Sequence, residues 1–265
     1  MTPMNTKTTP TSAAVILAAL LLPGTQTQVN ASIDWYSNVA YQNNFSSLND
    51  TGWTHLSAFA LSTGQTWDAS TGAYRLTAPA GGYNGYGFVG SVVTGLTLGN
   101  GYVQSDVVTW QGVGTYGGFG VGSRLSGLAT PLGLTGYAIV YEPYGADIRL
   151  QRLGPPSIFN NLGSMSVTLT PGSQYAFTLE TTGSSIVGSL WNVGQVGTSL
   201  VGSVSATDAT YASGSAGVFA VNITPMPVVD VTFDNFAVMI PEPGSLSLLG
   251  LGLAGFLAVR ARRTK

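Results

Sequence analysis

Apolar side chains alternate with polar ones along most of this 265-residue chain, and short runs of glycine, serine and threonine separate the alternating segments. In the segment Tyr175–Glu180, large apolar side chains recur at every second position, which is the period of a β-strand. The turn sequence Thr182-Gly183-Ser184 follows, and a second apolar segment runs from Ile186 to Trp191. Together these segments predict a β-hairpin.

The same pattern recurs through the chain and predicts an all-β fold. A second hairpin is expected from Tyr137–Glu142 and Asp147–Leu153, around the turn Pro143–Ala146. About a dozen strands at short, even spacing, with no helix among them, predict an antiparallel β-sandwich. Further strands are expected at Ala73–Thr77, Phe88–Thr94, Tyr102–Trp110, Gly117–Gly122, Met165–Thr170, Ala216–Val221 and Val228–Val238, and loops at Asn43–Thr54, Leu125–Gly136 and Gly154–Gly163.

The last predicted strand contains an irregularity. Val229, Val231 and Phe233 keep the two-residue period, but the next large apolar residues are Phe236 and Val238. The three-residue step from Phe233 to Phe236 predicts a β-bulge near Asp234-Asn235.

The N-terminal segment has the features of a secretory signal peptide. The apolar run Ala13–Leu22 precedes Pro23-Gly24, and the sequence Val29-Asn30-Ala31 resembles a signal-peptidase site. A run of ten apolar residues is too short to cross a bilayer, which needs about 20. We therefore expect residues 1–31 to be removed, leaving one domain over residues 32–240; a buried core helix is the alternative.

The C-terminal segment carries an apolar run, Ser245–Val259, between Pro-Glu-Pro and an arginine cluster. A helix over this run would be about 22 Å long, shorter than the hydrocarbon core of about 30 Å. The basic residues after it would stay on the cytoplasmic side, and the prolines keep the preceding backbone extended. These features are those of a temporary membrane anchor rather than a permanent one.

This arrangement resembles the PEP-CTERM sorting signal over residues 241–265. The matching residues are Pro241, Glu242, Pro243, Arg260, Arg262 and Arg263. The resemblance implies a Gram-negative host that makes exopolysaccharide and recognition by an exosortase-type membrane transpeptidase. It also implies a transient stay in the inner membrane before delivery to the cell surface or extracellular matrix. An ordinary tail anchor is the alternative.

Composition excludes several classes of function. The chain has no cysteine and one histidine, which leaves no cysteine nucleophile, no cysteine metal site and no histidine pair for a metal. Between residues 32 and 240 there is no lysine, whereas all acidic residues except Glu242 lie there. A polyanion such as DNA would be repelled, so nucleic-acid binding is not expected.

The body resembles the concanavalin A-like, laminin G-like jelly rolls. The resemblance rests on "GYAIVYEP", "IRLQRL", the hairpin "GSQYAFTLETTGSSIVGSLW", "SGSAGVFA" and the closing "VTFDNFAV". It implies two curved antiparallel sheets with a carbohydrate site on the concave face. It also implies a structural Ca²⁺ near the first and last strands, for which Asp234 and Asp230 are the candidate ligands.

The sequence offers few catalytic candidates. Glycosidases use paired carboxylates, and those of this superfamily commonly carry Glu-x-Asp-x-Glu on one strand, a motif that is absent here. Glu142 and Asp147 flank a turn and could face each other across the hairpin; Asp106 is the next candidate. Solvated turn carboxylates are the alternative interpretation.

Carbohydrate binding is better supported, because aromatic faces stack on sugar rings while polar groups bind hydroxyls. Trp110, Tyr141, Arg149 and Gln104 are the candidates for a binding face, although each aromatic could instead belong to the core. The resulting hypothesis is a non-catalytic surface or matrix protein that binds or organises exopolysaccharide. A glycoside hydrolase or lyase of the same fold, and a purely structural surface protein, are the alternatives.

Overall fold

The computed structural model describes residues 38–56, 64–78, 86–111, 117–127, 133–155, 157–194, 197–223 and 228–241. These residues form strands and loops only, which confirms the all-β prediction. No helix in these ranges is long and apolar enough to cross a membrane. The predicted signal segment and nearly all of the predicted sorting segment lie outside the described residues.

The strands are β1 Val39–Asn43, β2 Trp53–Leu56, β3 Thr66–Asp68, β4 Tyr74–Ala78, β5 Tyr86–Val93, β6 Gly101–Gln111, β7 Gly117–Ser126, β8 Thr135–Glu142, β9 Asp147–Leu153, β10 Phe159–Ser166, β11 Tyr175–Thr182, β12 Ser185–Gly194, β13 Gly197–Thr207, β14 Ser215–Ile223 and β15 Val229–Met239.

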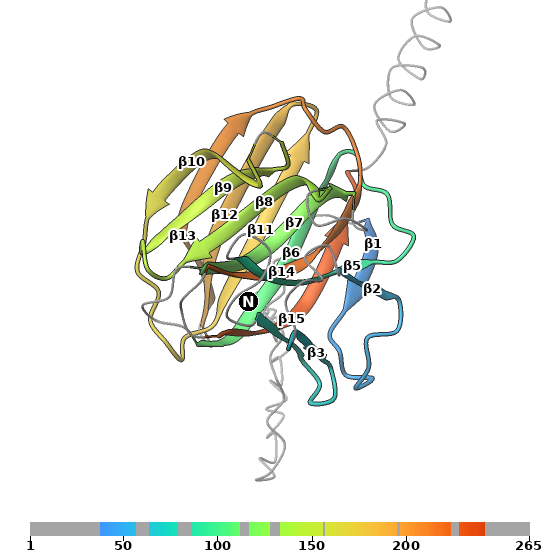
Figure 1. Ribbon diagram of the computed structural model, residues 1–265, viewed down its shortest axis with the longest axis vertical. Coiled ribbons are helices and arrows are strands. Elements are labelled where there is room, and N and C mark those ends of the chain that lie inside the picture. Colours follow the sequence, from blue (N-terminus) through green and yellow to red (C-terminus); the bar gives the residue numbers. More distant parts are fainter. Residues whose placement is uncertain are drawn as a thin grey trace, which may run out of the picture.

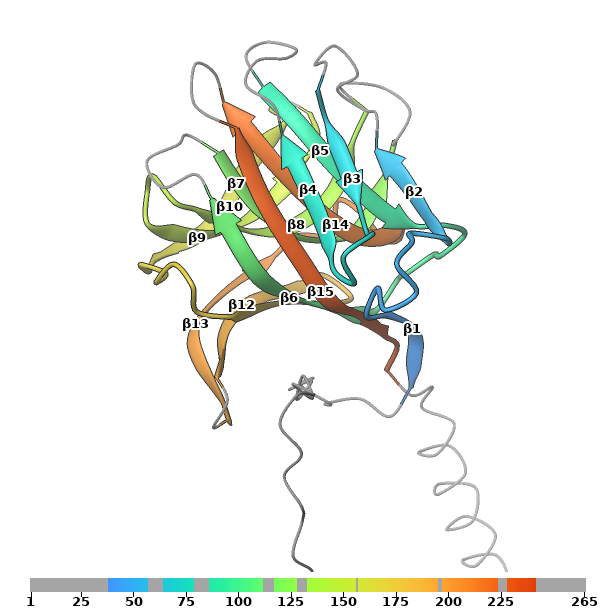
Figure 2. The same cartoon turned by 90° about the horizontal axis from the view of Figure 1, so that it is seen from below.

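The strands form two antiparallel sheets that pack face to face (Figure 1). The eight-stranded sheet has the order β13-β12-β11-β6-β15-β4-β3, with β1 paired to the C-terminal half of β15. The seven-stranded sheet has the order β10-β9-β8-β7-β14-β5-β2. In Figure 2 the part of the eight-stranded sheet from β13 to β1 arches, with β13 and β1 turned away from the other sheet, so the outer face of this part is concave.

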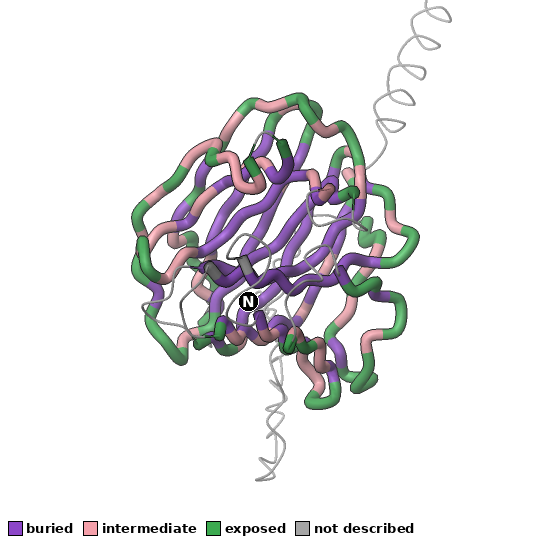
Figure 3. Tube along the Cα trace, viewed as in Figure 1, coloured by how far each residue is buried: buried purple, intermediate pink, exposed green. Residues whose placement is uncertain are grey.

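The main core lies between the sheets. Strand β11 contributes Tyr175, Phe177 and Leu179, as its alternation predicts, and β8 contributes Tyr137 and Ile139 from the opposite sheet. Buried positions run through the middle of both sheets in Figure 3. A second apolar cluster lies on the outer face of the seven-stranded sheet and includes Phe88, Leu125, Val140, Leu153 and Phe219.

The two predicted hairpins and the bulge are confirmed. Strands β11 and β12 pair up to Thr182 and Ser185, on either side of a two-residue turn in which Gly183 has a φ of 57°. Strands β8 and β9 pair up to Glu142 and Asp147. In β15 the register shifts between Asp234 and Ala237.

Two loop and strand boundaries were predicted wrongly. The segment Gly154–Gly163 was expected to be a loop, but β10 begins at Phe159, and the strand expected at Met165–Thr170 ends at Ser166. Strand β10 is at the edge of its sheet and most of its side chains are only partly buried, so it lacks the strong apolar alternation that marks an inner strand.

Glycines in β7 allow close packing of the backbone. The side of β7 that carries Phe119 and Val121 faces the core, and Gly120 lies on the other side. A Cβ at Gly120 would collide with the carbonyl oxygen of Ile139 on β8. The glycine-rich sequence "GGFGVG" is therefore a tightly packed inner strand and not a flexible or phosphate-binding loop.

Candidate functional site

A polar cluster lies on the concave outer face of the eight-stranded sheet. Gln104 and Asp106 alternate on β6 with Val103 and Val107, which face the core. Asp106 is directly opposite Asp234 on β15, so the two carboxyl groups share a face. Gln104 is opposite Thr178 on β11.

The bulge in β15 places an amide on this cluster. Asn235 has a φ of 48°, in the left-handed region that asparagine tolerates better than most residues. Its side-chain Nδ2 donates a hydrogen bond to Oδ2 of Asp106 at 2.8 Å, and its backbone N–H donates to Oδ1 of Asp234 at 2.7 Å. We call Gln104, Asp106, Asp234 and Asn235 the Asp106 cluster.

The carboxyl groups of the Asp106 cluster have no basic partner among the described residues. Asp106 and Asp234 are 7% and 4% exposed, and neither takes part in an ion pair within the described ranges. Burial and the nearby Asp234 charge raise the pKa of Asp106 to about 7, against the lowering effect of the Asn235 and Gln104 amides. Burial also raises the pKa of Asp234. Asp106 therefore exchanges its proton near neutral pH.

Unpaired polar atoms adjoin these carboxyl groups. Gln104 is fully buried; its amide is close enough to Asp106 to lower the pKa of that carboxyl group, but neither Nε2 nor Oε1 makes a hydrogen bond of 3.5 Å or less in the part of the chain that the structure describes. The same holds for Oδ1 of Asp106. Buried polar groups without partners cost about 1–3 kcal/mol each, so such a group in a native fold needs an explanation, of which a bound ligand is one.

An aromatic side chain borders the cluster across β11. Half-buried Trp191 on β12 donates a hydrogen bond from Nε1 to Oγ1 of Thr178 at 3.1 Å. It packs with Ala176 and Val193 on the same outer face. The indole ring lies on the same face as an amide and two carboxyl groups, two strands away from β6, and a stacking surface with polar groups is the combination that sugars need.

Two of the predicted binding residues lie elsewhere, in the core between the sheets. The ring centroids of Trp110 and Tyr141 are 5.8 Å apart, and Phe119 packs against both. The register between β6 and β15 shifts between Thr232 and Phe233, which turns Trp110 to the inner face of β6, opposite to Gln104. Trp110 and Tyr141 are 8% and 2% exposed.

The fourth predicted binding residue, Arg149, lies on the outer side of the other sheet with the two predicted turn carboxylates. Its Nη1 is 2.8 Å from Oε2 of Glu142, and its Nε is 3.0 Å from Oδ2 of Asp147. Burial raises the pKa of Glu142, against the lowering effect of Arg149. The four predicted binding residues therefore lie in three separate places: the outer face of each sheet and the core between them. Glu142 and Asp147 do come together as predicted, but Arg149 bridges them.

The aspartates predicted to bind calcium do not form one site. Asp230 is ion-paired with Arg75, whose Nε donates to its Oδ1 at 2.9 Å, whereas Asp234 lies beside Asp106. No group of three or more histidine, cysteine, aspartate or glutamate residues converges on a point within the described residues. The pair Asp230 and Asp234 therefore does not fit a calcium site; Asp234 instead lies opposite Asp106 and accepts a hydrogen bond from the backbone N–H of Asn235.

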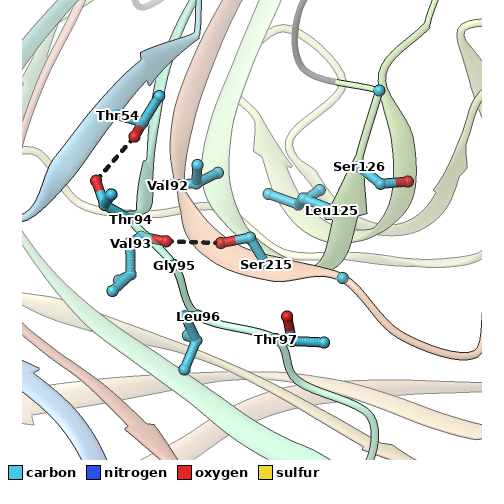
Figure 4. Close-up of a pocket in the computed structure, with 12 residues that line it drawn as sticks. Thr54, Val92, Val93, Thr94, Gly95, Leu96, Thr97, Leu125, Ser126 and Ser215 are labelled. Carbon is cyan, nitrogen blue, oxygen red and sulfur yellow. Dashed lines mark hydrogen bonds between the residues drawn. The ribbon is translucent and has the colours of Figure 1, made fainter.

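A pocket of about 440 Å³ opens near the ends of β2, β5, β7 and β14. Figure 4 shows that Thr54 and Thr94 point toward each other, as do Ser215 and the backbone of Val93. The corresponding oxygen–oxygen distances are 2.8 and 2.9 Å. Among the described residues, no charged side chain lines this pocket, and these hydroxyls are bonded within its wall, so we assign it no function.

Sequence reasoning selected Gln104 and Asp106 but missed Trp191, Thr178 and Asn235. Trp191 belongs to the predicted hairpin, where it is opposite Ala176. Because Tyr175 faces the core, Ala176 and its partner Trp191 must face outward, so the sequence could have placed Trp191 on the outer face. The bulge was predicted, but its consequence, an asparagine amide aimed at Asp106, depends on the pairing of β15 with β6.

Comparisons with known proteins agree with this architecture. Residues 240–263 match the PEP-CTERM protein-sorting motif. No curated protein matches the sequence. Among solved structures, carbohydrate-binding module CBM66 from Bacillus subtilis is 16% identical with a TM-score of 0.51, covering 72% of this chain and 97% of its own. The described chain has the jelly-roll fold of lectins and glucanases.

Other jelly rolls of this kind are binders or enzymes. The lumenal domain of VIP36, in a Ca²⁺- and Man3GlcNAc-bound form, is 7% identical with a TM-score of 0.55, covering 75% of this chain and 87% of its own. The β-glucanase of Bacillus licheniformis is 14% identical with a TM-score of 0.50, covering 77% of this chain and 99% of its own. At these identities the likeness establishes the jelly roll and leaves the chemistry to the residues of this chain.

Proposed function

We propose that this protein is a non-catalytic binder of extracellular polysaccharide, with its binding face on the concave side of the eight-stranded sheet. The observation that carries the proposal is that the fully buried Gln104 amide beside Asp106 makes no hydrogen bond of 3.5 Å or less within the described residues and shares its face with Trp191. Polar groups that the fold leaves unsatisfied would be satisfied by sugar hydroxyl or amine groups, while the indole offers a stacking face.

The arginine between Glu142 and Asp147 argues against catalysis at the β8–β9 turn. Arg149 contacts both carboxylates and occupies the space between them, where a glycosidase needs the scissile bond and, for inversion, a water. This network is better explained as a structural ion-pair cluster that fixes the turn.

The sorting part of the proposal rests on the match at residues 240–263. An exosortase-type membrane transpeptidase would recognise Pro241, Glu242 and Pro243, with the arginines at 260, 262 and 263 held on the cytoplasmic side. The protein would leave the inner membrane for the cell surface or matrix after cleavage. Mass spectrometry of the surface species tests this: we expect a C-terminus without the arginine cluster, and an intact terminus would refute the sorting proposal.

The binding proposal is tested with a glycan array and a reducing-sugar assay on the purified protein. We expect saturable binding without release of reducing ends, and a loss of binding of about tenfold or more in Trp191→Ala, because stacking on one ring contributes on the order of 1 kcal/mol or more. Tyr144→Ala is the matched control, since Tyr144 is 55% exposed on the β8–β9 turn, away from the Asp106 cluster. Equal losses in both variants, or no binding, would refute the proposal.

One observation favours the enzyme alternative. Asp106 has a pKa of about 7 and is opposite a second carboxyl group on Asp234, which is the pattern of a general acid beside a partner carboxylate. Release of reducing ends that is abolished by Asp106→Asn would establish a hydrolase and overturn the non-catalytic proposal.

A further inference from the structure

The charge of the Asp106 cluster indicates what kind of sugar it suits. We propose that it recognises the protonated amino group of an amino sugar, so that the preferred ligand is a deacetylated hexosamine polymer. This inference rests on the proposed polysaccharide-binding function and specifies its ligand class.

Two carboxyl groups share this face, and no cation from the described residues neutralises them. Asp106 and Asp234 are directly opposite each other on neighbouring strands, and both are almost fully buried. In the described ranges, the ion-paired arginines lie with Asp230, Glu142, Asp147 and Asp208 instead. An acidic pair of this kind requires a proton or an external cation at neutral pH.

The unpaired atoms of the cluster are mostly hydrogen-bond acceptors. Oδ1 of Asp106 and Oε1 of Gln104 are buried without partners in the described part of the chain. An ammonium group has three donors and no acceptor, so it could donate to these two oxygens and to a carboxylate oxygen of Asp234 once a local opening of this face exposes them. A sugar hydroxyl has only one donor and no charge.

The surrounding groups reinforce this preference. On the same outer face, β6 contributes Tyr102, β11 contributes Glu180, and β15 contributes Asp230, which is paired with Arg75 of β4. None of these adds an unpaired positive charge. A polymer of uronic acids would meet two carboxylates without a counter-charge and would be repelled.

Binding should depend on pH in a way that a neutral ligand would not show. The bound ammonium requires an ionised Asp106, so a rising proton concentration competes with the ligand for that carboxylate. Because burial holds the pKa of Asp106 at about 7, affinity for the amine should fall as the pH decreases from 7 to 5. Asp106→Asn should abolish this dependence.

The experiment is calorimetric titration of the full-length protein with a glucosamine hexamer, its fully N-acetylated form, and neutral and uronic-acid oligosaccharides of equal length. We expect the glucosamine hexamer to bind about tenfold more tightly than the acetylated form, since charge-assisted hydrogen bonds supply that difference. Asp106→Asn should remove the preference while the protein remains folded. Asp68→Asn should keep it, because Asp68 is a half-buried acid on β3 that accepts a hydrogen bond from the backbone N–H of Ser70, away from the Asp106 cluster.

Each alternative outcome is distinct. If the acetylated or neutral oligosaccharide binds as tightly as the amine, and Trp191→Ala weakens it, polysaccharide binding stands and the amine inference fails. If no oligosaccharide binds, both fail. If spermidine binds as tightly as the glucosamine hexamer, or if Ca²⁺ raises the melting temperature and Asp234→Asn abolishes that rise, the cluster is a general cation or metal site and the inference is overturned.

Discussion

The buried arginine of β7 gives the sharpest prediction about stability. Arg124 is 2% exposed and lies in a bulge between Ser123 and Ser126, with a φ of 53°. Its guanidinium donates to the carbonyl oxygens of Gly99, Gly183 and Tyr211, at 2.8 to 2.9 Å. One side chain therefore joins three loops that are far apart in sequence, and no carboxylate of the described residues accepts a hydrogen bond from it.

Arg124→Met should remove all three bonds while keeping most of the apolar volume. Each carbonyl oxygen that loses its hydrogen bond costs about 1–3 kcal/mol if it stays buried. Part of this cost should be recovered where the loops move and water reaches the carbonyl. We therefore expect a loss of about 3–5 kcal/mol in the free energy of unfolding, a large share of the roughly 5–15 kcal/mol of a typical domain. Arg124→Lys should be nearly as damaging, because an ammonium cannot replace the planar fork.

Urea denaturation followed by tryptophan fluorescence measures this loss. Arg75→Met is the matched control, because the Arg75 side chain is 54% exposed and pairs with Asp230 at the surface, where ion pairs contribute about 0–1 kcal/mol. The reasoning would be refuted if Arg124→Met and Arg75→Met shifted the transition equally, with unchanged slopes.

Three further predictions concern pH and packing. Because the pKa of Asp106 is raised to about 7 in the folded protein, stability should fall as the pH rises from about 4 through 7, and Asp106→Asn should flatten that slope in pH-dependent melting. Burial opposes ionisation of Asp208, but hydrogen bonds from Thr210 and Tyr137 lower its pKa to about 2. The stability that ionised Asp208 contributes to the fold should therefore be lost as the pH falls from about 4 to 2. Asp208→Asn should remove this part of the pH dependence of the melting temperature. Gly120→Ala should lower the free energy of unfolding by about 3 kcal/mol or more, because the added methyl group would collide with a β8 carbonyl oxygen. Gly95→Ala is the control: Gly95 has open space around it and a φ of 73°, so the change should cost only about 1 kcal/mol in urea denaturation.

The inner strands were predictable from sequence because burial imposes alternation on them. Tyr175, Phe177 and Leu179 face the core as their spacing requires, and the step to Phe236 located the bulge in β15. Edge strands carry a weaker signal: β10 and β13 each have one unpaired side and many partly exposed residues. Strand β13 was missed for this reason.

The candidate site was less predictable, because its geometry depends on register. Trp110 and Gln104 are six positions apart on β6, so a regular strand would place both on one face. The shift opposite Thr232 and Phe233 moves Trp110 into the core instead. Nothing in the local sequence of β6 marks that shift, since it arises from the pairing with β15, more than a hundred residues away.

The pairing of the first and last strands connects the fold to the proposed sorting. Val39 is opposite Met239, and the backbone N–H of Ile240 donates to the carbonyl oxygen of Asn38 at 3.0 Å. The described body therefore begins and ends at the same part of the eight-stranded sheet. Only residues 240–244 separate Met239 from the apolar run that begins at Ser245, and an extended chain of that length reaches about 18 Å. While the sorting segment is in the membrane, the end of β15 would be held close to the bilayer, so cleavage beyond Pro241 would release the body without removing any of its paired strands.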